Sequence, residues 1–357
     1  MMDRCKAFFA KSFFHDYRTL VGLWLLLGVL AAVMKMHSHN NFLIFRGVFW
    51  HTWQQVSLYA AYPAEYGDVN HYGPLFSLVF APFAVVPEWL GLLLWCVALS
   101  LFLYVAIRRS DLTKYQQLFV LWFCAHELLT ALYMQQFNIA IAAIIVLAFF
   151  FFSKHKVRFI LSLIGWSVVL FVAPMLISSP EYILGQYQEW YTCLVEKNGE
   201  NLDSIAQNIS LLGMAHRVSG IAFNDLWIIL PGLLMFGIPY LRFSQYKNMA
   251  FRQTLLASVL MFVVLFSTGS ESSGYIIPFV GIVIWYTAAP WQRTNWDIAL
   301  LVFAFVLSSL SPSDLFPAYL RKEWVQPYAL KALPVTLIWL KLCFEMYTKD
   351  YAAKSIR

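Results

Sequence analysis

Two polar segments of this chain carry most of the side chains that could do chemistry. The first, HSHNNFLIFRGVFWHTWQQVSLYAAYPAEYGDVNHYGP at residues 37–74, contains the carboxylates Glu65 and Asp68 among histidines, asparagines and one arginine. A carboxylate beside a bound hydroxyl can act as a general base, and cations or hydrogen-bond donors can hold an anionic leaving group such as phosphate. The segment therefore contains the parts of a group-transfer site.

Asp68 is the carboxylate that best fits the role of base. It lies six residues before Pro74, and Asn70, His71 and Tyr72 beside it could orient an acceptor hydroxyl. Glu271 is the rival, because the turn FSTGSESSGY holds it between two apolar blocks. Geometry decides such assignments, so the lesser candidates Glu65 and Glu127, and the absence of any base, stay open as alternatives.

A phosphate group needs charge-assisted hydrogen bonds, and few cations lie near apolar blocks on this side of the chain. Arg46 is the first choice, followed by His51, His216 and Arg217. Contacts with lipid headgroups are the competing explanation for all four. Gln136 and Asn138 are candidates to hydrogen-bond a sugar, although polar residues in apolar helices also join helices to one another.

Metal chemistry has little support in the sequence. His37 and His39 lack a third ligand, and Asp68 with Asn70 supplies only two oxygen donors. The five cysteines form no CxxC pattern and no disulfide framework. We expect no cofactor, and a divalent metal is the alternative.

The elements that position these residues are membrane helices. The 357 residues are 61% hydrophobic and 12% charged, with a mean hydropathy of +0.64, and the apolar residues gather in blocks near the roughly 20 residues that span a bilayer. The formal charge of +6 comes from short basic clusters between blocks, which excludes a nucleic-acid-binding face. We expect an all-α polytopic membrane protein with about ten transmembrane crossings.

The expected crossings make up one membrane domain, residues 1–357. The blocks run at about 20–34, 75–107, 116–133, 139–152, 159–177, 226–241, 255–266, 275–289, 298–310 and 333–346. Pro82 and Pro87 predict a break in the block at 75–107, giving a short or re-entrant helix before a full span. No small-residue cleavage site follows the first block, which favours an uncleaved anchor over a signal peptide.

Charge asymmetry predicts the orientation. With the block at 75–107 taken as one crossing, one side of the membrane receives Arg4, Lys6, Lys11, Arg18, Arg108, Arg109, Lys114, Lys154, Lys156, Arg158, Arg242, Lys247, Arg252, Arg293, Lys349, Lys354 and Arg357. By the positive-inside rule this side, with both termini, is the cytoplasm. The other side holds most acids and the long loops at about 37–74 and 178–225. Function is therefore expected on the outer, extracytoplasmic side of the membrane.

The first outer loop also carries a helical pattern. Apolar residues Phe42, Phe45, Phe49, Trp53 and Val56 recur at spacings of three to four. This predicts a helix lying in the membrane interface with its polar face outward. A helix that only caps the bundle is the alternative.

Several segments together resemble a known family. The runs NNFLIF, LYAAYP and YGPLFSLVFAPFAVVP, the helix MQQFNIAIAAIIVLAFF, the turn LFSTGSESSGYIIP and the outer segment YILGQYQEWYTCLVEKNGENLDSIAQNISLLGMAHR are similar to glycosyltransferase family 87. That family belongs to the C-type membrane glycosyltransferases. The resemblance covers about residues 40–290.

The resemblance implies a function. Family members transfer a sugar, often mannose, from a polyprenyl-phosphate donor to a glycan or glycolipid acceptor outside the cytoplasmic membrane. For this reaction the candidate substrate-binding residues are Asn41, Arg46, His51, Glu65, His71, Tyr72, Gln136, Asn138, Gln207, His216 and Arg217, and the candidate bases are Asp68 and Glu271. Membrane lipids are the remaining expected partners.

Two departures from the family pattern favour an alternative function. Asn41 stands where the family has an aspartate, and an amide cannot act as a base. Between Phe152 and Phe159 an expected helix pair is reduced to SKHKVR. The alternative is a non-catalytic protein that binds or moves a lipid-linked glycan, although we find no internal repeat of the kind that transporters show.

Overall fold

The computed structural model describes residues 11–204 and 207–352, and that part of the chain is helical with no strand. Every expected apolar block is helical, so the all-α prediction is confirmed. Arg4, Lys6, Lys354 and Arg357, which the charge pattern assigns to the cytoplasm, lie outside the described residues. The helices derived from the apolar blocks are α3 (Tyr17–Met34), α5 (Phe76–Ala84), α6 (Glu88–Arg109), α7 (Lys114–Phe123), α8 (Ala125–Tyr133), α9 (Asn138–Lys154), α10 (Lys156–Val172), α13 (Leu226–Gly237), α14 (Met249–Leu265), α15 (Ile276–Ala288), α16 (Asn295–Phe303) and α18 (Ala332–Thr348).

The remaining elements are short or lie in the loops. They are α2 (Ser12–His15), α4 (Asn40–Gln54), α11 (Pro180–Asp203), α12 (Leu211–Ser219), α17 (Ala318–Leu320), the 3-10 turns Ala173–Leu176, Ile238–Leu241, Phe243–Lys247 and Ser272–Tyr275, and the π-helical turns Ala304–Leu310 and Arg321–Val325. The long helix α11 was not predicted as a helix, because its apolar residues form no continuous block.

Three helical stretches of the described chain are long and apolar enough to cross a membrane. They are α3, α6 and the run Lys156–Leu176, and five shorter apolar helical stretches accompany them. The figure of about ten crossings stays a prediction, because those shorter stretches have 10–17 residues and need flanking residues at the interface to complete a crossing.

The predicted break in the block at 75–107 is confirmed. Pro82 lies inside α5, and Pro87 precedes the first residue of α6. The two helices approach closely at Gly91, where a Cβ atom would lie 2.3 Å from the carbonyl oxygen of Phe83. Only glycine fits there, so this residue fixes the corner from which the first outer loop enters the bundle.

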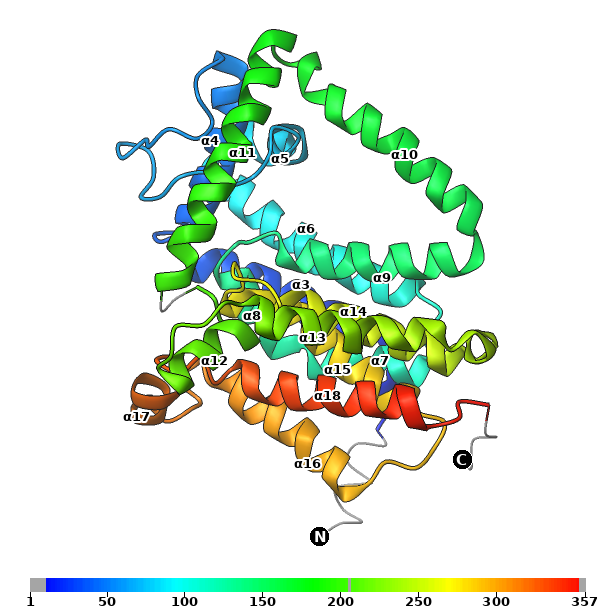
Figure 1. Cartoon of the computed structure of the whole chain (residues 1–357). Coiled ribbons are helices and arrows are strands. Elements are labelled where there is room, and N and C mark those ends of the chain that lie inside the picture. Colours follow the sequence, from blue (N-terminus) through cyan, green and yellow to red (C-terminus); the bar gives the residue numbers. More distant parts are fainter. Residues whose placement is uncertain (1–10, 205–206, 353–357) are drawn as a thin grey trace.

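The bundle is held by pairs of packed helices. α14 packs along α15, and α3 packs along α6, with Trp24, Trp285 and Trp339 completely buried. In Figure 1 these helices run side by side, whereas α10 and α11 form an arm that leaves the bundle after α9 and returns to it beside α4 and α5. No residue of α10 is buried.

Helix α4 confirms the helical pattern of the first outer loop, but its aromatic side chains face the protein. Phe42, Phe45 and Phe49 are buried, and Phe45 meets the ring of Phe76 on α5 with centroids 4.9 Å apart. Trp53 is exposed, and Val56 lies beyond the end of the helix. α4 therefore caps this end of the bundle, as in the alternative interpretation.

Helix α11 is fastened to the first outer loop. Gln186 accepts a hydrogen bond from the backbone N–H of Leu58 at 2.7 Å, and the Trp190 ring nitrogen donates to the carbonyl oxygen of His71 at 2.9 Å. These contacts bring the two long polar segments together on one side of the bundle.

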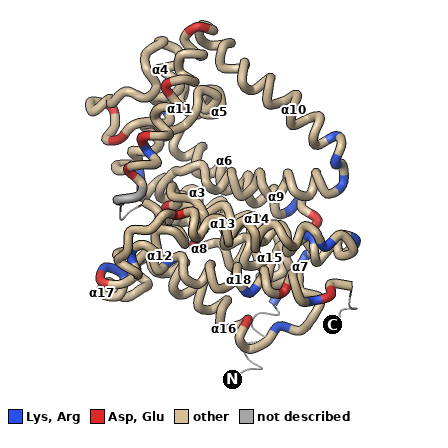
Figure 2. Tube along the Cα trace, in the orientation of Figure 1, with Lys and Arg blue, Asp and Glu red and all other residues tan. Residues whose placement is uncertain are grey.

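Charge is distributed along the bundle as the sequence predicts. In Figure 2 Lys and Arg residues gather where α9 meets α10 and where α14 begins, and many Asp and Glu residues lie near α4 and α11. Hydrogen bonds join residues of the basic end, including Arg252 to Ser153 at 2.6 Å. The arrangement is consistent with one cytoplasmic and one outer end.

Candidate functional site

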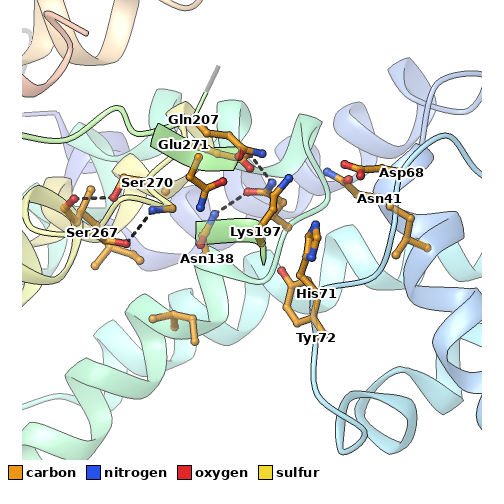
Figure 3. Close-up of a pocket in the computed structure, with 18 of the residues that line it drawn as sticks. Asn41, Asp68, His71, Tyr72, Asn138, Lys197, Gln207, Ser267, Ser270 and Glu271 are labelled. Atoms are coloured by element: carbon orange, nitrogen blue, oxygen red, sulfur yellow. Dashed lines mark hydrogen bonds between the residues drawn. The ribbon is translucent and has the colours of Figure 1, made fainter. Parts of the chain in front are cut away.

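A cavity of about 400 Å³ lies where the two outer segments meet the bundle. Six places in the chain supply its walls: the start of α4, the loop at 68–72, the start of α9, the end of α11, Gln207 in the segment after α11, and the turn between α14 and α15. Figure 3 shows Asp68 and Asn41 on one side, Glu271 and Gln207 on the other, and Lys197 between them. The chain folds so that residues more than 200 positions apart face one space.

Eight of the predicted site residues line this cavity. They are Asn41, Asp68, His71, Tyr72, Gln136, Asn138, Gln207 and Glu271. Both candidate bases are among them, together with the amides that could bind a sugar. The sequence therefore identified a group of side chains that the fold brings together.

Glu271 is oriented by a hydrogen-bonded network. Gln136 donates from Nε2 to the Glu271 carboxylate at 2.7 Å, and its own carbonyl oxygen accepts from Asn138 at 2.8 Å and from the hydroxyl of Ser273. The amides thus join the start of α9 to the α14–α15 turn, which was the alternative to sugar binding. They also fix the direction of a carboxylate that lines the cavity.

The surroundings of Glu271 disfavour its charged form. Burial raises the pKa of this carboxyl group, while the Gln136 hydrogen bond and the nearby Lys197 lower it and Asp68 raises it. A carboxyl group with a raised pKa in a polar cavity is a candidate acid–base catalyst.

A buried ion pair contacts the same turn and stabilises it. Lys331, at the start of α18, donates from Nζ to the carbonyl oxygen and the hydroxyl of Ser272 at 2.9 and 3.0 Å, and it pairs with Glu127 at 3.1 Å. Glu127 is completely buried, so its carboxylate does not reach the surface of the bundle. The partner that satisfies this acid is Lys331, 204 residues away.

Asp68 differs from Glu271 in exposure. It is exposed, and its Oδ1 accepts from the backbone N–H of Val69 at 2.8 Å. In Figure 3 its carboxylate lies next to the amide of Asn41, which donates to the carbonyl oxygen of Met134 at 2.7 Å. Asp68 therefore brings a carboxylate beside the position where the family resemblance expects one.

Sequence reasoning missed several residues of the cavity, and Lys197 and Asn201 are the two that matter most for its chemistry. Both line it and both belong to α11. Lys197 is the only Lys or Arg among the described residues that line this cavity, and its Nζ also lies 3.3 Å from the exposed carboxylate of Glu200. Their spacing of four places them on one helical face, which was a usable signal only once α11 was known to be a helix.

Three predicted residues of the first loop lie outside the cavity lining. Arg46 pairs with Glu88 at 3.3 Å and donates to the carbonyl oxygen of Ala84. His51 is buried and lies 3.1 Å from Glu65. These side chains hold α4 to neighbouring segments.

The two cations of α12 also have protein partners. His216 lies 2.6 Å from the carboxylate of Asp225 and stacks on the ring of Phe223. Arg217 donates to the carbonyl oxygens of Ser204 and Gln207 at 2.6 and 2.8 Å. Arg217 therefore fixes the backbone at Gln207, which does line the cavity.

No metal-binding group is found in the described part of the chain: within residues 11–204 and 207–352, no three His, Cys, Asp or Glu side chains are arranged to hold an ion. His39 instead lies 2.8 Å from Glu88.

Comparison with known families decides the class of the protein. Residues 70–158 and 142–268 match the model of glycosyltransferase family 87, so the matched region extends over more than half of the 357 residues. The chain belongs to glycosyltransferase family 87. It is therefore a glycosyltransferase associated with the membrane. Neither the curated proteins nor the solved structures gave a match.

The extent of the family 87 match bears on the site. The two matched ranges overlap at residues 142–158, which cover most of α9 and the start of α10. This is the region where the sequence lacks an expected helix pair. Tyr72, Gln136, Asn138, Lys197 and Gln207 fall inside the matched region. Asp68 and Glu271 lie just outside its two ends, so their roles depend on the geometry of this family 87 protein alone.

Proposed function

We propose that this glycosyltransferase transfers a sugar, with mannose as the first donor to test, from a polyprenyl phosphate to a glycan or glycolipid acceptor. The reaction takes place at the outer face of the cytoplasmic membrane of a bacterium. The observation that carries the proposal is the cavity between the outer segments, where two carboxylates, one lysine and several amides face the same space.

The chemistry that this set supports is a single displacement. The base removes the proton of an acceptor hydroxyl, and the oxygen attacks the anomeric carbon of the donor. The bond from that carbon to the phosphate oxygen breaks, and the phosphate leaves with the electron pair. One displacement inverts the configuration at the anomeric carbon. The protein must therefore supply a base on one side and stabilise an anion on the other.

We assign the role of general base to Glu271. Two observations support it over Asp68: the Gln136 hydrogen bond at 2.7 Å and the Lys331 brace fix its orientation, and burial raises its pKa. A base is most effective when its pKa approaches the working pH. Asp68 is the second candidate, supported by its position beside Asn41.

Lys197 is assigned to the leaving phosphate. It is the one Lys or Arg in the lining among the described residues, and it lies between the two carboxylates. An ammonium group can donate to several phosphate oxygens, so it stabilises the charge that appears as the sugar leaves. Apolar lining residues, including Ile44, Phe45 and Ile277, offer a surface for the first prenyl units.

Reconstitution tests the proposal directly. The full chain in lipid vesicles is given radiolabelled polyprenyl-phosphate hexoses and a crude lipid acceptor extract, beside vesicles that carry Glu271→Gln. Transfer by the wild type with at least one donor is the expected result. No transfer with any donor would favour the non-catalytic alternative, for which Asn41 is the specific observation.

A further inference from the structure

Two residues that line the cavity each have a buried hydrogen-bonding atom with no partner among the residues that the structure describes. The two atoms are Nε2 of His71 and Oδ1 of Asn201. Buried polar atoms in folded proteins almost always form hydrogen bonds, and each exception calls for an explanation. Both residues line the same cavity, so a ligand that rotates these side chains toward it could supply the missing partners.

The hydrogen-bonding role of His71 is set by its neighbours. Its Nδ1 lies 3.3 Å from the sulfur of Cys193, and that thiol lies 3.5 Å from the carbonyl oxygen of Asn70. A carbonyl oxygen only accepts, so the thiol hydrogen points to Asn70. The sulfur is then free to accept from Nδ1–H, and Nε2 is left with a lone pair.

The charge state of His71 agrees with this arrangement. Burial, followed by the charge of Lys197, lowers the pKa of the imidazole, with smaller opposing effects from Asp68 and Glu200. The ring is therefore neutral at pH 7, and Nε2 acts as an acceptor.

Asn201 presents the same kind of atom from α11. It lies one helical turn after Lys197 on the face that lines the cavity, and its side-chain nitrogen faces the chain at Gly269, where a Cβ atom would lie 3.5 Å away. Its oxygen is buried without a donor. Two unpaired acceptors thus flank the lysine.

We propose that His71 and Asn201 bind two hydroxyl groups of the transferred sugar and so determine which sugars the enzyme accepts. This inference rests on the proposed function. The matching ligand is a neutral hexose with free hydroxyls at both points, because each hydroxyl donates to one acceptor. A deoxy sugar leaves an acceptor buried without a partner, and a site built to hydrogen-bond a hydroxyl discriminates strongly against an analogue that lacks it.

The first test measures binding without transfer. The full chain in nanodiscs is titrated with methyl α-mannopyranoside and its four monodeoxy analogues, followed by saturation-transfer NMR. We expect the wild type to bind at least two of the analogues about tenfold more weakly than the parent sugar. His71→Phe should remove the discrimination at one position and Asn201→Leu at another, while His71→Gln, which keeps an acceptor, should retain part of it.

A second pair of variants covers the case in which His71→Phe does not fold. Cys193→Val removes the sulfur that fixes the His71 tautomer, and Cys193→Ser keeps a group that both donates and accepts. Cys193 is not part of this cavity's lining, so neither variant removes a group that contacts the sugar. The two variants differ in whether residue 193 can still accept a hydrogen bond from Nδ1–H of His71. Loss of discrimination in Cys193→Val and its retention in Cys193→Ser is expected.

The outcomes separate this inference from the proposed function. Wild-type protein that binds and discriminates sugars but transfers none would leave the subsite standing and overturn the function. The subsite would be overturned if the wild type transfers sugar and the variants His71→Phe and Asn201→Leu discriminate between deoxy donors as the wild type does. Wild-type protein with no preference among the analogues would also overturn it.

Discussion

Lys331 donates to the backbone carbonyl oxygen of Ser272 at 2.9 Å, directly beside Glu271. The ammonium group also pairs with Glu127 and lies over the ring of Tyr275, so the turn that carries the proposed base is braced by a charge buried in an apolar bundle. Buried charges in a membrane protein are costly and seldom kept without a role.

The brace predicts how stability and activity respond to mutation. Lys331→Met leaves the buried Glu127 without its charged partner and should destabilise the fold by about 3–5 kcal/mol. The double variant Lys331→Met/Glu127→Gln should recover part of that loss in thermal unfolding but still show a lowered kcat with little change in KM. A double variant with wild-type kcat would show that the pair only stabilises the bundle.

The two carboxylates of the cavity are distinguished by substitution. Glu271→Gln should reduce transfer by a factor of about 10²–10⁴, which is usual for the loss of a general base, while donor binding and expression are retained. Asp68→Asn should keep a larger share of the activity. The reverse ranking, measured as initial rates in vesicles, would move the role of base to Asp68.

The pH dependence of transfer should follow the ionisation of Glu271. A base acts in its deprotonated form, so kcat falls as the pH drops through its pKa, and burial places that fall above the usual range for a glutamate. Because Lys197 lowers this pKa and Asp68 raises it, Lys197→Met should move the fall to higher pH and Asp68→Asn to lower pH. If the pH profiles of both variants shift in the same direction, or neither shifts, Glu271 is not the base.

Lys197 should determine the use of the donor phosphate. Lys197→Met is expected to weaken donor use by about tenfold or more, equivalent to roughly 1.4 kcal/mol. Lys197→Arg retains the positive charge, so its donor use should lie between that of the wild type and that of Lys197→Met. The measurement is kcat/KM for the polyprenyl-phosphate sugar at fixed acceptor, and equal values for all three proteins would exclude a phosphate contact.

Reporter fusions test the orientation of the chain. Fusions after Arg109, Lys156 and Lys247 should report the cytoplasm, and fusions after Asp68, Glu200 and Ser272 should report the outside, because basic residues next to apolar helices stay in the cytoplasm. An outer Arg109 with a cytoplasmic Glu200 would reverse the orientation and place the cavity on the wrong side for the proposed reaction.

Hydropathy and turn chemistry were sufficient to predict the helices of the bundle and the break before α6. They also identified Gln136, Asn138 and Glu271, since polar residues next to long apolar blocks are conspicuous. The function of the amphipathic segments was harder to predict. Arg46 was chosen as a cation near the membrane, yet its charge is taken by Glu88 on α6, a pairing that depends on how two helices pack. Lys197 and Asn201 could be recognised only after α11 was known to be helical.

The exposed helix α10 acts as a spacer for the cavity. With 17 residues it extends roughly 25 Å. Its length therefore contributes to the distance and the rotation of α11 relative to α9. Adding or removing one residue in α10 would turn the chain that leaves its end by about 100° around the helix axis. α11 could then keep the contacts of Gln186 and Trp190 with the first outer loop only if the connection at residues 173–179 took up the rotation, although no atom of the cavity itself had been changed.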